Sequence, residues 1–387
     1  MLDLGKIRDE IDATDDEIVR LFQHRMALTA EVAQYKIETG KAVFDAERER
    51  QKLEKLTGEG TNAFNTKGIQ ELFQQIMSIS RKRQYQLLTE NGGEEMTDYT
   101  QVDHLPTHGR RVVFQGVEGA YSFGAMKEFF DDTITSFHVD TWKEAMEAIT
   151  RGEADYAVLP IENSTAGIVS DIYDLLVEYP HYIVGEQELP VEHVLMALPG
   201  AKAEEIRTVI SHPQALAQSS VFVQQHGFKT STWGNTADAA RHVAELNDPS
   251  VAAIASAETA GLYGLQILST GINADGDNTT RFIVIERAAA APAMTGEGQR
   301  LALLFTARHK PGQLAAALDQ IGARGFNMEC IKSRPLPHVP FEYYFYVQIV
   351  CPAGSTGAGC QTLLDTLTSV CSTLRLLGAF TLDSTEK

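Results

Sequence analysis

The sequence predicts a protein of three domains: an all-helical domain, then an α/β domain, then a small β-α-β-β-α-β domain. Two observations support this division. Hydrophobic residues recur at helical spacing over residues 1–90, whereas short apolar runs alternate with helical patterns farther along the chain. Two stretches, 86–109 and 287–300, are rich in polar residues or in Ala, Gly and Pro, as is typical of linkers. We therefore expect domains at 1–90, 110–286 and 300–382.

The composition indicates an acidic globular protein. The 387 residues include 52 acidic and 33 basic side chains, and the net charge of -19 argues against a nucleic-acid or anionic-membrane partner. No apolar run is long enough to span a bilayer, and the charged N-terminus does not resemble a signal peptide. The four cysteines fit neither a zinc site nor a disulfide framework. We expect a cytoplasmic protein with reduced thiols and with no metal or other cofactor.

The helical domain begins with an unusually long helix. No Gly or Pro interrupts the chain between Lys6 and Thr39, and Gly40 then ends the run. A second helix is expected to begin near Asp45, and a third to cover roughly 66–88. The first helix would be about 50 Å long. A domain of this size offers little to pack along such a length, so we expect a partner helix from a second copy of the chain.

The two later domains show the patterns of buried strands. In the α/β domain, short apolar runs predict strands at 112–114, 156–161, 208–211, 251–255 and 282–285. In the last domain, alternating elements are expected at 301–307, 312–323, 328–334, 343–350, 360–371 and 373–380. Their order, β-α-β-β-α-β, is that of the ferredoxin-like motif.

Three cations of the first helix can be divided by geometry. Arg25 and Lys36 lie 11 residues apart, so they share a face of the helix about 16 Å apart along its axis. Arg8 lies roughly 25 Å from Arg25 and points about 100° away. If Arg8 is functional, it therefore belongs to the pocket of an antiparallel partner. The competing interpretation is a solvated face of i, i+4 charge pairs, which is common on long helices.

Further polar residues on the second and third helices complete a pattern. Together the polar positions resemble the site of the all-helical chorismate mutases: Arg8, Arg25, Lys36, Asp45, Arg48, Glu49, Ser80 and Gln84. The resemblance covers nearly all of residues 4–85. It implies an intertwined homodimer with two equivalent sites, each of which takes Arg8 from the neighbouring chain.

The resemblance also implies the reaction and the role of each residue. Chorismate would be rearranged to prephenate without a nucleophile or a metal, because the enzyme has only to hold a dicarboxylate in a compact conformer and stabilise the breaking ether oxygen. Lys36 and Gln84 would donate hydrogen bonds to that oxygen, and Glu49 would bind the ring hydroxyl. The remaining residues would bind the substrate: Arg8, Arg25, Asp45, Arg48 and Ser80.

In the α/β domain, polar residues directly follow a predicted buried strand. The apolar run 156–161 is followed by Glu162, Asn163, Ser164 and Thr165. Open α/β sheets bind ligands at the carboxyl ends of their strands and beside helix N-termini. The alternative is the start of a helix that Ser164 or Thr165 caps, and the pattern by itself does not decide between the two.

Several motifs of this domain resemble prephenate dehydratase over residues 111–286: Gly116, Gly119–Ser122, Glu162–Gly167, Ser211–Gln214, Tyr263–Leu265 and Thr280–Phe282. The resemblance implies two α/β lobes around a cleft, similar to periplasmic binding proteins. It also implies that prephenate loses carbon dioxide and hydroxide to give phenylpyruvate.

The resemblance to prephenate dehydratase implies that Thr280 contacts the hydroxyl group that leaves prephenate. A threonine hydroxyl is too weak an acid to give up its proton at neutral pH, so we expect Thr280 to donate a hydrogen bond to the leaving oxygen. Glu162 would be the proton source if the cleft raises its pKa. The other residues expected nearby are Asn163, Ser164, Thr165 and Arg281.

The last domain resembles the small regulatory ACT domains, which bind amino acids. The matching residues occupy two loop positions: Gly312, Gln313 and Leu314, and Ser333, Arg334 and Pro335. The resemblance implies feedback inhibition by phenylalanine at an interface between two such domains. Two departures bear on the affinity for this effector, because the family usually has Ala at Gln313 and Glu at Lys332. The alternative is a domain that only dimerises.

As a whole, the chain resembles the bifunctional chorismate mutase–prephenate dehydratases of phenylalanine synthesis. An alternative of another class is a non-catalytic sensor that binds prephenate or phenylalanine and reports it. The complete polar sets in both domains favour an enzyme. A nearer alternative is an arogenate dehydratase of the same fold, because the sequence alone does not show how the cleft would treat an amino group.

Overall fold

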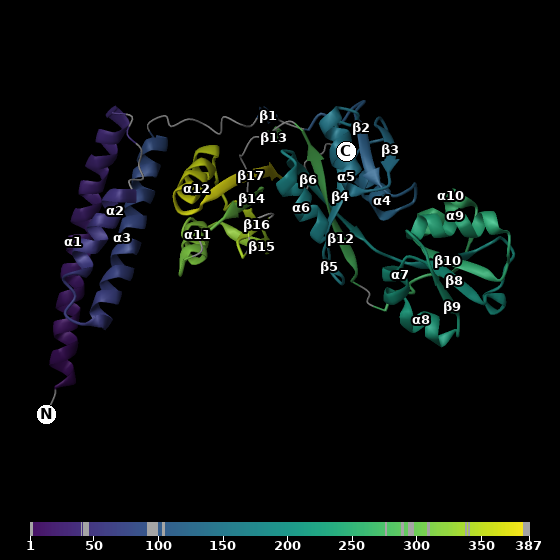
Figure 1. Cartoon of the computed structure of the whole chain (residues 1–387), viewed down its shortest axis with the longest axis horizontal. Helices are drawn as coiled ribbons and strands as arrows, with labels where there is room; N and C mark the ends of the chain where they lie inside the picture. The colour runs from purple at the N-terminus through teal and green to yellow at the C-terminus, as the bar shows by residue number, and fades with distance from the viewer. Residues whose placement is uncertain are drawn as a thin grey trace.

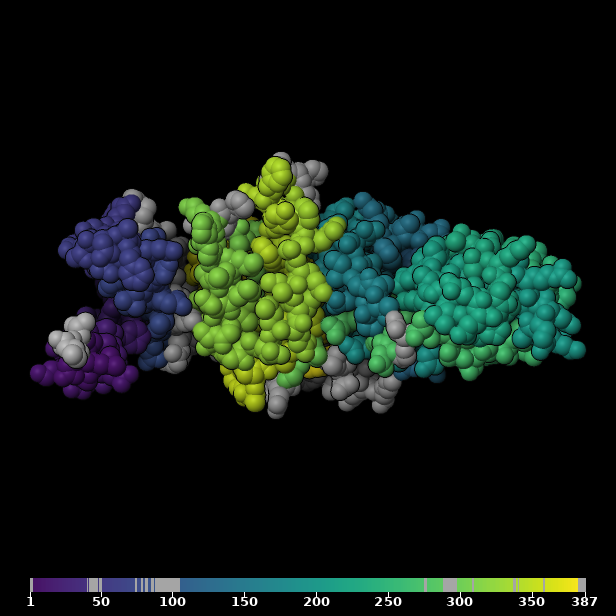
Figure 2. Space-filling view, turned by 90° about the horizontal axis from the view of Figure 1, so that it is seen from below, coloured from purple at the N-terminus to yellow at the C-terminus, as the bar shows by residue number. Residues whose placement is uncertain are grey.

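The computed structural model describes residues 3–39, 41, 46–90, 100–102, 105–274, 277–287, 290–292, 298–307, 310–336, 339 and 341–381. The molecule is elongated, and the domain that is last in the sequence lies in the middle (Figure 1). In Figure 2 this domain, green to yellow, separates the purple helices from the teal α/β lobes. Within the described residues, no helix has both the length and the apolar character needed to cross a bilayer.

The N-terminal domain consists of the three predicted helices, α1 (Leu4–Thr39), α2 (Ala46–Thr57) and α3 (Ala63–Glu90). Helix α1 packs against α3 and buries only Thr29 and Ala33. Large apolar side chains of α1 are instead about half exposed: Leu4 60%, Ile11 53%, Ile18 52%, Leu21 50% and Leu28 46%. The described residues of the chain therefore leave an apolar stripe along α1 partly exposed.

The α/β domain has two lobes, as expected. The first lobe contains a mixed sheet in the order β3-β2-β4-β12-β6. Its strands are β2 (Arg111–Gln115), β3 (Thr135–Val139), β4 (Tyr156–Asn163), β6 (Tyr182–Pro190) and β12 (Thr279–Glu286), and the short β5 (Gly167–Ile168) pairs with β4. The helices of this lobe are α4 (Tyr121–Phe129), α5 (Trp142–Arg151) and α6 (Ser170–Glu178).

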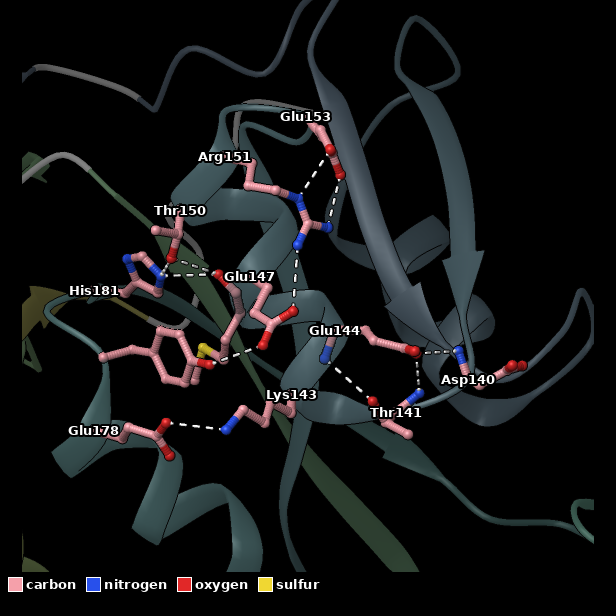
Figure 3. A network of polar contacts seen from close by, with 12 residues as sticks. Asp140, Thr141, Lys143, Glu144, Glu147, Thr150, Arg151, Glu153, Glu178 and His181 are labelled. Atoms are coloured by element: carbon pink, nitrogen blue, oxygen red, sulfur yellow. Dashed lines mark hydrogen bonds and ion pairs between the residues drawn. The ribbon is translucent and has the colours of Figure 1, made fainter.

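Helix α5 shows how local sequence sets the ends of these elements. Thr141 and Glu144 form a reciprocal capping box at its start, which Figure 3 shows together with the neighbouring ion pairs. Gly152 ends the helix in the left-handed conformation, with a φ of 70°. The helix then packs against β2 and β4.

The second lobe is a separate five-stranded sheet in the order β11-β7-β10-β8-β9. The strands are β7 (Val194–Ala197), β8 (Thr208–Ser211), β9 (Lys229–Thr232), β10 (Val251–Ala255) and β11 (Gln266–Ser269). The helices are η1 (Ala203–Glu205), α7 (Pro213–Gln218), α8 (Ser220–Gln225), α9 (Thr236–Leu246) and α10 (Ala257–Tyr263). The chain enters this lobe after β6 and returns through β12, so two crossings connect the lobes.

The C-terminal domain has the predicted β-α-β-β-α-β order. Its elements are β14 (Arg300–Thr306), α11 (Gln313–Gly322), β15 (Asn327–Pro335), β16 (Tyr343–Val350), α12 (Gly357–Val370) and β17 (Thr373–Phe380). The sheet is antiparallel in the order β15-β16-β14-β17. All four cysteines are free thiols. The two predicted linkers are more structured than expected, because β1 (Thr100–Val102) pairs in parallel with β13 (Ala290–Pro292).

One face of the C-terminal sheet packs against the first lobe. A bulge in β17 places Gly378 opposite Ala302 but Leu376 opposite Leu303, so Leu377 is the extra residue. The side chain of Leu377 is fully buried in a core shared with the first lobe. Gly378 follows at a close backbone approach, where an added Cβ atom would overlap the carbonyl oxygen of Ile183 in β6.

We expect Gly378→Ala to loosen this contact between the domains. The atom that the new methyl group meets belongs to the backbone, so a change of rotamer does not relieve the overlap, and we expect a cost of at least about 2 kcal/mol. Limited proteolysis should release the C-terminal domain faster than in the parent protein. Gly261→Ala is the matched control, because no atom lies within 4 Å of its added Cβ. Equal proteolysis of both variants would contradict the close approach.

Candidate active sites

The helical domain brings three of its predicted site residues together. Arg25 on α1 donates hydrogen bonds to the Ser80 hydroxyl and, at 3.3 Å, to the carbonyl oxygen of Ile76 on α3. Ser80 and Gln84 are 6% and 8% exposed. The Gln84 Nε2 donates to the Ser80 carbonyl oxygen at 3.3 Å, and its Oε1 is buried with no hydrogen-bond partner among the described residues. The unpaired Oε1 can accept a hydrogen bond from a ligand, whereas a bond donated to a ligand oxygen would have to come from the second hydrogen of Nε2.

The other predicted residues of this domain are less enclosed. Lys36 is half buried on α1, eleven residues beyond Arg25, whereas Arg8 and Arg48 are exposed. Arg8 precedes Arg25 by 17 residues, which is about 25 Å along one continuous helix, so a single chain does not bring them to one pocket. Asp45 and the side chain of Glu49 lie outside the described residues.

The two lobes enclose a cleft of about 560 Å³. The starts of α4, α5 and α9 contribute to its wall, together with the β4–β5 turn and the crossing after β6. Ala120 is the N-cap residue of α4 and its side chain makes no capping hydrogen bond, so first-turn amides there are open to a ligand. None of the described residues that line the cleft is Asp, Glu, Lys or Arg.

Asn163 and Thr280 lie together in this cleft. They are cross-strand partners at the ends of β4 and β12. The Asn163 Oδ1 accepts hydrogen bonds from the backbone nitrogens of Thr165 at 3.1 Å and Ala166 at 2.7 Å, which fixes the orientation of the amide. The Asn163 Nδ2 then donates to Thr280 Oγ1 at 2.9 Å and to Asn278 Oδ1 at 2.7 Å. Because the Thr280 hydroxyl accepts this bond, its own hydrogen can be donated to a ligand.

Three buried donors around the cleft have no acceptor among the described residues. They are Trp142 Nε1, Gln218 Nε2 and Asn278 Nδ2. Trp142 and Gln218 line the cleft, and Gln218 and Asn278 line an adjoining pocket of about 270 Å³. A buried donor without a partner costs about 1–3 kcal/mol, so these groups suit a ligand rich in acceptor oxygens. Sequence reasoning assigned no role to any of the three, although Gln218 and Asn278 lie in or near motifs that it considered.

A second network connects the lobes beside the cleft. His193 is 1% exposed on the crossing between them. Its Nδ1 lies 2.9 Å from the hydroxyl of Tyr121 in the first lobe, and its Nε2 lies 2.9 Å from Oε1 of Gln218 in the second. Burial lowers the pKa of His193, so the ring is neutral at pH 7. His212 caps α7 by accepting a hydrogen bond from the Gln214 nitrogen at 3.3 Å.

Two residues expected beside Thr280 lie on the opposite face of the sheet. The Glu162 Oε1 is 2.6 Å from Nζ of Lys332 in the C-terminal domain. Arg281 contacts Glu186 at 2.9 Å and Glu188 at 2.8 Å. Successive side chains of a strand point to opposite faces, so Asn163 and Thr280 face the cleft while Glu162 and Arg281 face away.

Ser164 and Thr165 occupy the turn after β4 and do not cap a helix, because α6 begins only at Ser170. The Ser164 hydroxyl donates to the carbonyl oxygen of Asp277 at 3.0 Å and accepts from the backbone nitrogen of Thr279 at 3.0 Å. Thr165 lines the smaller pocket. The turn is therefore part of the cleft wall rather than a helix start.

Comparison with known proteins identifies the families of both domains. A model of type II chorismate mutases matches residues 7–85, and a model of prephenate dehydratase matches residues 112–290. The chain is 32% identical over 384 residues to a bifunctional chorismate mutase/prephenate dehydratase of Enterobacter agglomerans, covering 97% of this chain and 95% of that protein. The chain belongs to the bifunctional chorismate mutase/prephenate dehydratase family. Its helical domain rearranges chorismate to prephenate, and its two-lobed domain converts prephenate to phenylpyruvate in phenylalanine biosynthesis.

Two further relatives of this bifunctional enzyme each match about three quarters of the chain. A crystal structure of prephenate dehydratase from Arthrobacter aurescens, in complex with L-Phe, superposes with a TM-score of 0.64 at 28% identity, covering 72% of this chain and 92% of that one. Arogenate dehydratase 5 of Arabidopsis thaliana is 37% identical over 306 residues, covering 74% of this chain and 71% of that protein. The sequence of the dehydratase domain is thus similar to enzymes named for either substrate.

The predicted regulatory residues of the bifunctional enzyme flank one pocket of the C-terminal domain. This pocket has a volume of about 400 Å³ and is lined by Leu314, Tyr343 and Phe345, among others. Ser333 and Pro335 on β15 are the register partners of Phe345 and Tyr343. Gly312 and Gln313 form the start of α11, where Gly312 has a φ of 78°. Arg334 instead contacts Asp174 on α6 of the first lobe.

Proposed function

We propose that the dehydratase reaction takes place between the lobes and that Asn163 and Thr280 assist the departure of the hydroxyl group. The observation that carries the proposal is the Asn163–Thr280 hydrogen bond at 2.9 Å, which directs the threonine hydrogen away from its partner. As the ring carboxylate leaves as carbon dioxide, the electrons of the broken bond enter the ring and the C–O bond electrons leave with hydroxide. Thr280 stabilises the charge that develops on this oxygen. The hydroxide is released and takes up a proton from the buffered solvent, so that the products are phenylpyruvate, carbon dioxide and water.

The neutral lining of the cleft supports the same assignment. A cation held against the ring carboxylate would stabilise the electrons that must flow into the ring, and would favour the ground state over the transition state. Uncharged donors such as Trp142, Gln218 and Asn278 suit carboxylate oxygens without this penalty. The position of Glu162, on the other face of β4 and bound to Lys332, does not support a role as the proton source.

The mutase site is proposed to be shared between two chains. The support is the exposed apolar stripe of α1 together with the distance between Arg8 and Arg25. An antiparallel partner helix covers this stripe and brings its own Arg8 to the pocket that contains Arg25 and Lys36. Arg25, Arg8 and Arg48 then bind the carboxylates, Ser80, Asp45 and Glu49 contact the remaining polar groups, and Lys36 and Gln84 reach the ether oxygen.

A shared site predicts complementation between inactive variants. Arg8→Ala and Lys36→Ala are each expected to abolish most mutase activity, yet a heterodimer of the two has one site in which both residues are intact. After the two are unfolded, mixed at equal amounts and refolded, about half of the dimers are mixed, so activity should recover to about a quarter of the parent level. The refolded single variants are the controls. A mixture no more active than either variant would show that Arg8 does not act across the interface.

Phenylalanine is proposed as a feedback inhibitor that binds the C-terminal domain. The support is the pocket beside Leu314 and Tyr343, together with the similarity of this chain to a dehydratase whose crystal structure contains L-Phe. The decisive experiment supplies chorismate to the purified protein and follows phenylpyruvate, with and without phenylalanine. We expect phenylpyruvate to accumulate after a lag, and phenylalanine to slow its formation. Prephenate that accumulates unchanged would contradict the dehydratase assignment, and an unchanged rate would contradict the regulatory one.

The same preparation tests the choice of substrate. Prephenate and arogenate are supplied separately, and kcat/KM is compared for the two. We expect prephenate to be preferred, because the described lining of the cleft contains no carboxylate to pair with the ammonium group of arogenate. A higher kcat/KM for arogenate would reverse this preference.

A further inference from the structure

The C-terminal domain contacts the dehydratase sheet directly behind the proposed catalytic pair. Lys332 on β15 extends to Glu162 on β4, with 2.6 Å between Nζ and Oε1, and both side chains are about one quarter exposed. Glu162 precedes Asn163, and its register partner Arg281 follows Thr280. Lys332 thus contacts the strand pair one residue away from the hydrogen bond that orients the threonine hydroxyl.

These two residue pairs lie beyond an irregularity in the sheet. Arg281 pairs with Glu162, but the next residue, Phe282, pairs with Pro160, so Ile161 is the extra residue of a bulge. A bulge interrupts the ladder and bends the strand locally. Beyond the bulge, the ends of β4 and β12 are joined by the bond from the Ser164 nitrogen to the Thr279 carbonyl oxygen at 2.8 Å and by the side chains of Asn163 and Ser164. Contacts to neighbouring elements add to these bonds from the other face of the sheet.

Three carboxylates on this face of the sheet, those of Glu162, Glu186 and Glu188, interact with Arg281. Arg281 contacts both Glu186 and Glu188 on β6. Glu186 is 1% exposed, and although burial raises its pKa, it receives further support from Gln348 on β16, whose Nε2 donates to Oε2 at 2.9 Å. Without Lys332, Glu162 would compete with Glu186 and Glu188 for the guanidinium group of Arg281, whereas Arg300 also interacts with Glu186. Such competition would displace Arg281, and with it the neighbouring Thr280.

We propose that Lys332, a residue of the C-terminal domain, is a positioning residue for the dehydratase reaction. Its ion pair with Glu162 holds the end of β4 in register with β12, so that Asn163 keeps the Thr280 hydroxyl aimed into the cleft. The inference rests on the role proposed above for Asn163 and Thr280. It makes the dehydratase site dependent on the docking of a domain that contributes no residue to the described lining of the cleft.

The test compares four variants of the full chain without phenylalanine. Lys332→Met removes the charge, Lys332→Arg keeps it, and the double variant Lys332→Glu/Glu162→Lys reverses the pair. Lys143→Met is the matched control, because it breaks an exposed ion pair of the same lobe, with Glu178 at 3.1 Å, on helices α5 and α6 (Figure 3). kcat and KM for prephenate are measured for each, and mutase activity of the same sample is the internal standard.

We expect Lys332→Met to lower the dehydratase kcat by about tenfold to a hundredfold, with KM nearly unchanged, because misplacement of a catalytic group affects the transition state more than binding. Lys332→Arg should recover most of the loss. The reversed pair should recover only part of it, because Glu162→Lys places a second cation beside Arg281. Lys143→Met should match the parent. A normal kcat in Lys332→Met would overturn the proposal. So would failure of Lys332→Arg to recover activity while its melting temperature and mutase activity remain those of the parent.

Two outcomes separate this proposal from the one on which it rests. If Thr280→Ala retains parent turnover, the role of the catalytic pair is wrong, and the positioning role of Lys332 is wrong with it. If Thr280→Ala is inactive while Lys332→Met is normal, only the positioning role fails. The reversed pair also addresses Glu162, because a lysine at position 162 has no carboxyl group with which to protonate a leaving hydroxide.

Discussion

Thr280→Ala is expected to lower the dehydratase kcat by at least about a hundredfold, which is the usual effect of removing one donor to a developing oxyanion. The structure gives the reason. Asn163, itself held by two backbone nitrogens, donates to Thr280 Oγ1 at 2.9 Å and leaves the threonine hydrogen for the substrate. Single-turnover assays with prephenate measure the loss directly, without a contribution from product release.

Two control variants test whether the effect comes from the hydroxyl group of Thr280 or from the shape of its side chain. Thr280→Ser keeps the hydroxyl group and should retain most turnover, whereas Thr280→Val keeps the shape and should be as slow as alanine. Mutase activity should stay at the parent level in all three, because the helical domain contributes none of the described residues that line the cleft. Parent-like turnover of the valine variant would rule out a hydrogen-bonding role for Thr280.

Lys36→Ala should reduce chorismate mutase turnover by at least about a hundredfold while the fold survives. The rearrangement needs no proton transfer, so most of the catalysis comes from positioning the substrate and from stabilising charge on the ether oxygen. Lys36 is half buried on α1, on the same helical face as Arg25. Steady-state loss of chorismate measures the effect, and circular dichroism checks the helices.

Lys67→Ala provides the matched control for the mutase prediction. Lys67 lies on α3 of the same domain, and its side chain is 78% exposed beside Glu71. Its removal is expected to change mutase turnover by less than about twofold, because exposed pairs of this kind contribute little. If both lysine variants lost activity equally, the loss would reflect the general charge of the domain rather than a specific contact of Lys36.

Most secondary-structure elements could be predicted because they depend on short-range patterns. The helical period in residues 4–39 and the apolar runs at 208–211 and 251–255 match α1, β8 and β10. The β-α-β-β-α-β order of the last domain was also readable, since each element there carries its own periodicity. The polar residues that identify the two enzymes were also predictable, because their spacing along single helices and strands is visible in the sequence.

Which side chains of β4 and β12 face the cleft could not be predicted from such local patterns. The sequence places Glu162 beside Asn163 and Thr280 beside Arg281, but one residue in a strand decides which face a side chain occupies. A bulge at Ile161 lies directly before this point. The contacts of Lys332, and the unsatisfied donors of Trp142 and Gln218, arise between segments far apart in the chain, and no local pattern records them.

The sequence by itself therefore determined the order and type of the three domains, the chemistry of their polar residues and the family to which the chain belongs. Only the tertiary structure decided which of those residues share a cavity. It placed Asn163 and Thr280 in the cleft and turned Glu162 toward Lys332 of another domain. The physical reason is that periodicity and composition act over a few residues, whereas strand pairing and domain docking depend on contacts between residues more than a hundred positions apart.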